Sequence, residues 1–262
     1  RVAEVLHHPR WRLHLVTSRG RHLLGREGPW RTPLGYAGAF VSNALRRRAM
    51  GAWLERVVFS SGGAELPFAT HDYRSRQLPL TETNFMPALQ ASCSIPFVLR
   101  PVRHMPGAPA GVYWDGGITD YHLHLAYGQQ SQNAIELIAG SAYPTSAGGQ
   151  KPSDSGPTAS PGLVLYPHFQ HQVVPGWLDK GLKWRHRSTP ALDNMVVLSP
   201  SPDWVRSLPN AKLPDRNDFT HYGTDSRARA QAWLGATSAS QQLADEWAEW
   251  LQRPDMGAVH PL

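Results

Sequence analysis

Residues 91–125 constrain the fold of this chain more than any other stretch. A run of small residues, ASCS at 91–94, is followed by Ile95-Pro96, and a loop rich in Pro and Gly comes next. A short aromatic strand at 112–114 then delivers Asp115 into Gly116-Gly117. Two glycines let the backbone turn sharply and leave room beside a carboxylate. The pattern therefore predicts an acid placed at the open edge of a sheet.

Length and composition allow one large α/β domain or two small ones. The chain has 262 residues, of which 41% are hydrophobic and 18% charged, as in globular proteins with a real core. Its single cysteine, Cys93, excludes an internal disulfide framework and a Cys-based zinc site, and we expect it to be a small buried hydrophobe. No apolar run is long enough for a transmembrane helix, and we expect a cytoplasmic protein.

Periodicity places the main elements. Residues 144–162 are a low-complexity Pro/Ser/Gly segment, which predicts a flexible surface loop. Apolar alternation and short buried runs predict strands, and helical spacing with caps predicts helices, the last of them capped by Asp225. The predicted strands are 11–17, 53–59, a strand ending at 114, 163–166 and 195–198, and the predicted helices are 34–50, one ending near 92, and about 224–252.

Two linked blocks resemble a known family. The run ASCSIP with Pro101-Val102, followed at a loop's distance by VYWDGG (112–117), is similar to the second catalytic block of the patatin-like phospholipases. Further segments resemble a bacterial subgroup of that family, so that the likeness covers most of the chain: DGGITDYHLHL, LYPHF, VVPGWLDK and LPDRNDF. The resemblance implies a single domain over 1–262, with a three-layer α/β fold and a mostly parallel central sheet.

The resemblance also implies a serine–aspartate dyad that hydrolyses acyl esters or lipids without a cofactor. Asp115 matches the dyad aspartate, with Gly116 and Gly117 beside it as substrate-binding or supporting residues. No serine in the chain lies in Gly-x-Ser-x-Gly, and no Gly-rich oxyanion loop is present in the expected place. We therefore expect an N-terminally truncated, C-terminal part of such an enzyme, inactive by itself.

Two other functions compete with this one. A patatin-like binding protein would retain Asp115 after losing the chemistry. A metal-dependent hydrolase could use Asp120, His122 and His124, which share one face if the backbone is extended. Otherwise these groups line the cleft, with His122 supporting Asp115 or contacting a head group. His168, at the end of a predicted strand, is a further candidate site residue.

The net charge of +6 comes almost entirely from arginine. Such a charge favours anionic partners, but no nucleic-acid-binding motif accompanies it, so we predict no nucleic-acid binding. A transient contact with an anionic membrane surface is expected instead. The oligomeric state stays open.

Overall fold

A computed structural model describes residues 1–128 and 162–262, which form two compact units. The first unit comprises Arg1–Val164 and Val173–Asn194, and the second comprises Leu165–Gln172 and Met195–Leu262. The predicted loop at 144–162 lies, apart from its last residue, outside the described residues.

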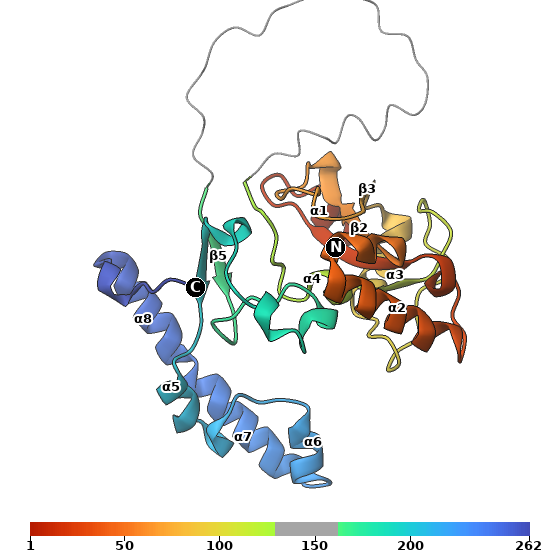
Figure 1. Cartoon of the computed structure of the whole chain (residues 1–262). Coiled ribbons are helices and arrows are strands. Elements are labelled where there is room, and N and C mark those ends of the chain that lie inside the picture. The colour runs from red at the N-terminus through yellow and green to blue at the C-terminus, as the bar shows by residue number, and fades with distance from the viewer. Residues whose placement is uncertain (129–161) are drawn as a thin grey trace, which may run out of the picture. The chain divides into compact units, whose positions relative to one another are not determined.

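A mixed four-strand sheet in the order β3-β2-β1-β4 forms the centre of the first unit (Figure 1). Strand β1 is antiparallel to both β2 and β4, whereas β2 and β3 are parallel. The strands are β1 (His14–Gly20), β2 (Leu54–Ser60), β3 (Ser75–Pro79) and β4 (Tyr113–Asp115).

The prediction of a mostly parallel sheet is therefore wrong, although the α/β class is confirmed. Gly20, at the end of β1, lies opposite Leu54, at the start of β2. The helical segment between them thus leaves and returns at the same end of the sheet. A strand–helix–strand order gives a parallel pair only when the helix carries the chain back along the sheet.

Helices cover both faces of this sheet. On β4 the side chains alternate, so Trp114 packs in a cluster with Tyr36 of α2, and Tyr113 packs in another with Ala88 of α3. The helices of the unit are α1 (Val2–Leu6), α2 (Arg31–Leu45), α3 (Glu82–Ser92) and α4 (Gly117–Asp120). Short 3₁₀ turns are η1 (His22–Gly25), η2 (Arg47–Ala52), η3 (Ser61–Gly63), η4 (Trp177–Asp179), η5 (Lys183–Arg185) and η6 (Pro190–Leu192).

A buried ion network lies on the sheet beside α4. Arg56 of β2 is fully buried. Its guanidinium donates to both oxygens of Asp120 at 2.5 and 2.7 Å and to both oxygens of Asp72 at 2.8 Å. Burial alone would lower the pKa of Arg56, but Asp120 and Asp72 raise it well above its ordinary value. The network fixes the segment that follows Asp115.

The second unit contains a two-strand sheet and four α-helices. Val164 N–H donates to Asn194 O and His168 N–H donates to Leu198 O, so the two strands run parallel. The elements are β5 (Val164–Pro167), β6 (Met195–Leu198), α5 (Pro202–Ser207), η7 (Pro209–Ala211), α6 (Asn217–Tyr222), α7 (Ser226–Ala239), α8 (Gln241–Gln252) and η8 (Met256–Ala258).

Two predictions for this unit need correction. Strands β5 and β6 form a separate sheet rather than part of the central one, and Leu165 of β5 is exposed. The predicted helix at 224–252 is two helices that meet at Ser240, whose hydroxyl donates to Thr237 O. Such hydroxyl bonds to the preceding turn compete with the helix ladder. The Asp225 cap is confirmed, since its carboxylate accepts from Ala228 N–H at 2.9 Å.

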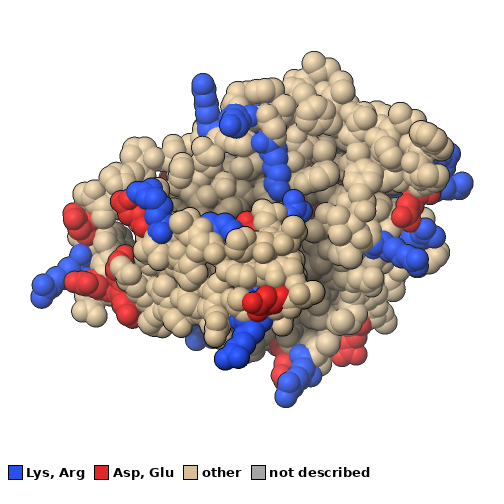
Figure 2. All heavy atoms as spheres, turned by 90° about the horizontal axis from the view of Figure 1, so that it is seen from below, with Lys and Arg blue, Asp and Glu red and all other residues tan. Residues whose placement is uncertain are grey.

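The surface charges are mixed rather than segregated on the face seen in Figure 2, where Lys and Arg side chains alternate with Asp and Glu. No helix in the described ranges is both long enough and apolar enough to cross a membrane.

Candidate functional site

Asp115 lies at the carboxyl end of β4, where the small-residue run meets the strand. Its N–H donates to Ser94 O at 3.0 Å, and it pairs with Thr17 of β1. Ser94 is itself buried and donates its hydroxyl to Gln90 O. The ASCS run thus supports the end of the strand, which leaves Ser94 in a structural role. Cys93, in contrast to the prediction, is exposed.

The two glycines leave room that a side chain at either position would fill. Gly116 has helical torsion angles, and a Cβ there would lie 2.3 Å from Val16 O of β1. At Gly117 a Cβ would lie 3.1 Å from Asp115 Oδ1. The contact at Gly116 is too short to be tolerated because Val16 O belongs to the backbone of β1, and the contact at Gly117 is a tight one with a side chain. The glycines therefore allow α4 to begin directly against β1 and leave the carboxylate uncovered.

The Asp115 carboxylate is oriented through one oxygen. Gly117 N–H donates to Oδ1 at 2.7 Å, whereas Oδ2 makes no hydrogen bond to any residue that the structure describes. Partial burial raises the pKa of the Asp115 carboxyl above its ordinary value, and the Gly117 hydrogen bond opposes this rise. The result is a fixed carboxylate with one oxygen available to accept a proton.

Tyr36 is a buried neighbour that the sequence did not single out. Its ring packs edge-on to Trp114 at 6.4 Å and against Phe97 at 5.4 Å. Its hydroxyl is buried without a hydrogen-bond partner among the described residues. Burial and then the charge of Asp115 raise the pKa of Tyr36. The signal in the sequence that could have pointed to Tyr36 is a single tyrosine among the small residues of a predicted helix, LGYAGAF.

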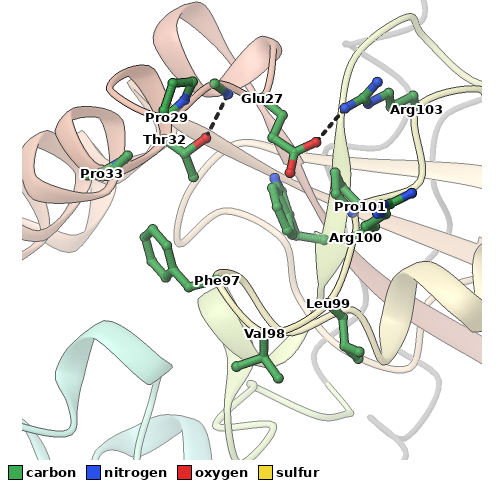
Figure 3. Close-up of a pocket in the computed structure, with 12 residues that line it drawn as sticks. Glu27, Pro29, Thr32, Pro33, Phe97, Val98, Leu99, Arg100, Pro101 and Arg103 are labelled. Carbon is green, nitrogen blue, oxygen red and sulfur yellow. Dashed lines mark hydrogen bonds and ion pairs between the residues drawn. The ribbon is translucent and has the colours of Figure 1, made fainter.

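A pocket of about 860 Å³ opens beside Trp114, the residue that precedes Asp115 (Figure 3). In Figure 3 Pro29 and Thr32 lie on one side of it, and Val98 and Leu99 lie on the other. Asp115 itself does not line it. The remaining lining residues are Glu27, Gly28, Pro33, Phe97, Arg100, Pro101 and Arg103.

The pocket wall combines apolar side chains with one ion pair. Arg103 binds Glu27 at 2.5 Å, and Gly28 N–H donates to Thr32 Oγ1 at 3.1 Å. Phe97 adopts a φ of 67°, a left-handed conformation that is uncommon for a non-glycine residue. In this conformation the Phe97 ring packs against the ring of Tyr36.

The three residues of the metal hypothesis are held by other partners. They do not form an extended face, because Asp120 ends α4 and is bound by Arg56. His122 Nδ1 accepts from Val174 N–H at 3.0 Å, and His124 contacts Val173 O and Thr189 Oγ1. Within residues 1–128 and 162–262 no group of three His, Cys, Asp or Glu side chains is placed to hold a metal ion. His122 is buried, and its role as a substrate-binding or supporting residue stays a prediction.

His168 belongs to the second unit. Its ring stacks on Tyr166 at 4.9 Å, and burial lowers its pKa. Its role as a site residue stays a prediction. The candidate site in the first unit is centred on Asp115, with Gly116 and Gly117 beside it.

Comparison of the chain with protein-family models, with curated proteins and with solved structures found no match. The patatin-like resemblance rests on the motifs alone.

Proposed function

We propose that this chain contributes the aspartate of a serine–aspartate acyl hydrolase of the patatin-like type, and that the serine lies outside residues 1–262. The observation that carries the proposal is the Asp115 carboxylate. It is held by Gly117 N–H at one oxygen and is left open at the other, and Asp115 is the last residue of β4.

Each part of this geometry suits a general base. In the proposed reaction a serine hydroxyl attacks an ester carbonyl while its proton passes to Asp115. A carboxylate whose pKa is raised by burial accepts a proton more readily than one with an ordinary pKa. The absence of a Gly-x-Ser-x-Gly serine means that the 262-residue chain has the base without the nucleophile. The substrates are acyl esters or lipids.

The experiment joins the chain to the residues encoded immediately upstream in its gene. We expect this longer protein to hydrolyse p-nitrophenyl esters and to be labelled by a fluorophosphonate on an upstream serine. Asp115→Asn should lower kcat/KM by at least about 100-fold, because general-base assistance is worth 10² to 10⁴. Asp193→Asn, an exposed aspartate of the same unit, should change it less than about twofold.

Three results would contradict the proposal. One is ester hydrolysis by the 262-residue chain that is abolished by mutating one of its own serines. Another is full activity of Asp115→Asn in the longer protein. If the upstream segment holds no serine in Gly-x-Ser-x-Gly and nothing is labelled, the chain belongs to a binding protein instead.

A further inference from the structure

Helix α2 exposes apolar side chains where a surface helix normally exposes polar ones. Trp30, immediately before the helix, is 79% exposed, and Leu45 at its end is 82% exposed. Leu34 and Val41 between them are exposed as well. At 3.6 residues per turn these four residues fall within about 60° of the helix circumference. We refer to Trp30, Leu34, Val41 and Leu45 as the α2 stripe.

The opposite face of α2 makes the arrangement more unusual. Its buried residues are small or polar: Thr32, Gly35, Tyr36, Ala39 and Asn43. An ordinary amphipathic helix at a protein surface has its large aliphatic residues on the buried side. Contiguous exposed apolar surface of this kind marks an interaction site.

The apolar surface continues beyond the helix. Residues 97–99 (Phe, Val and Leu) are all exposed and line the pocket of Figure 3 together with Pro33, which lies in the first turn of α2. Two segments far apart in the sequence thus meet at the start of α2, where Pro33 adjoins Leu34 of the stripe.

The charge around the stripe is strongly basic. Residues 21–54 contain six arginines, no lysine and one acid, Glu27. Glu27 is paired with Arg103, and Arg47 is paired with Asp120 and Asp179, but Arg31, Arg46 and Arg48 make no ion pair with any residue that the structure describes. Arg31 is exposed near the start of the helix, and Arg46 and Arg48 are exposed just after its end. Apolar and aromatic side chains flanked by arginines are the pattern of a helix that lies in a membrane interface.

We propose that the α2 stripe and residues 97–99 dock this protein onto an anionic lipid bilayer, with α2 lying in the plane of the interface. The apolar side chains enter the acyl boundary, Trp30 sits at head-group depth, and the arginines at both helix ends bind lipid phosphates. Docking requires no catalysis, so the docking proposal and the acyl-hydrolase proposal can be tested independently.

The test is co-sedimentation of the 262-residue chain with lipid vesicles. We expect binding to phosphatidylcholine vesicles that contain about one-third phosphatidylglycerol, at least about tenfold tighter than to pure phosphatidylcholine, and weakened by salt. Leu34→Ser with Val41→Ser should weaken binding at least about tenfold. Arg46→Gln with Arg48→Gln should weaken it roughly fivefold per arginine at low salt.

Matched controls come from the second unit. Leu234→Ser with Leu251→Ser replaces two equally exposed leucines, and Arg227→Gln with Arg216→Gln removes two exposed arginines. Neither should change binding by more than about twofold, and circular dichroism should show all variants folded. The proposal is overturned if the chain does not bind the anionic vesicles or if the control variants lose binding equally. It is also overturned if Leu34→Ser dissociates a dimer seen by light scattering, because a second copy would then cover the stripe.

Discussion

Arg56 and Arg103 show how far the surroundings of an arginine decide its energetic role. Both make ion pairs at about the same distance, but Arg56 is fully buried between two carboxylates, and Arg103 is largely exposed beside Glu27. A buried carboxylate that loses its partner remains desolvated and unpaired. An exposed one is simply rehydrated.

We predict that Arg56→Met destabilises the protein by about 3–5 kcal/mol, because Asp120 and Asp72 lose their main partner. Arg103→Met, the matched control, should cost less than about 1 kcal/mol. Urea denaturation of both variants measures the difference. Equal losses would mean that the Arg56 network contributes no more than a surface pair.

The sequence was enough to predict the position of some residues, whereas the roles of others depend on contacts that only the fold creates. The carboxylate at the end of β4 was predicted from the strand and the two glycines, and it lies there. The role of Asp120 was not predictable, because its partner Arg56 is far away in the sequence and only the fold brings them together. Tyr36 was missed for the same reason. Only the fold shows that its hydroxyl is buried without a hydrogen-bond partner among the described residues.

Helix α3 packs against β4 on the face of the sheet that carries Tyr113. Asn84, in its first turn, is buried and connects three segments. Its Oδ1 accepts from Thr81 N–H at 2.8 Å, and its Nδ2 donates to Pro79 O at 3.1 Å and to Pro106 O at 3.3 Å. The helix start is thereby bound to the chain both before it and after it.

Asn84→Ala should therefore destabilise the protein by about 1–3 kcal/mol, because one donor and two acceptors lose their partner. Thr83→Ala, one position earlier on the exposed side, should cost less than about 0.5 kcal/mol. Thermal or chemical denaturation distinguishes the two. A near-neutral Asn84→Ala would show that water replaces all three contacts.

Elements were easier to predict than their connections. The helix ending at Ser92 and the strands β1, β2 and β4 were expected near their observed places. Strand direction was wrong because apolar periodicity carries no information about which end of the sheet a helix returns to. The division at Ser240 was missed because the apolar spacing continues through it.

At the scale of the whole molecule, the two units differ in how much core they contain. Among the described residues nearly all buried hydrophobic side chains belong to the first unit, and the second contributes only Met195, Leu208 and Ala236. Helix α8 has no buried residue at all. Regions with few buried apolar contacts open at a lower free energy.

Hydrogen exchange followed by mass spectrometry should therefore show amides of α7 and α8 exchanging well before those of β2, whose seven residues are all buried. We expect protection in β2 to exceed that in α8 by at least about 100-fold, which corresponds to roughly 3 kcal/mol. Uniform exchange across both units would contradict this order and would indicate that they unfold together.

The contact between Gly116 and Val16 O has a consequence for how this chain can change over time. Any side chain at position 116 would force β1 and β4 apart, and so the glycine is required by the sheet whether or not Asp115 accepts a proton. A descendant with another residue in place of Asp115 would keep Gly116 in order to fold. This glycine therefore records the architecture of the strand end, and only the residue before it can report on the chemistry.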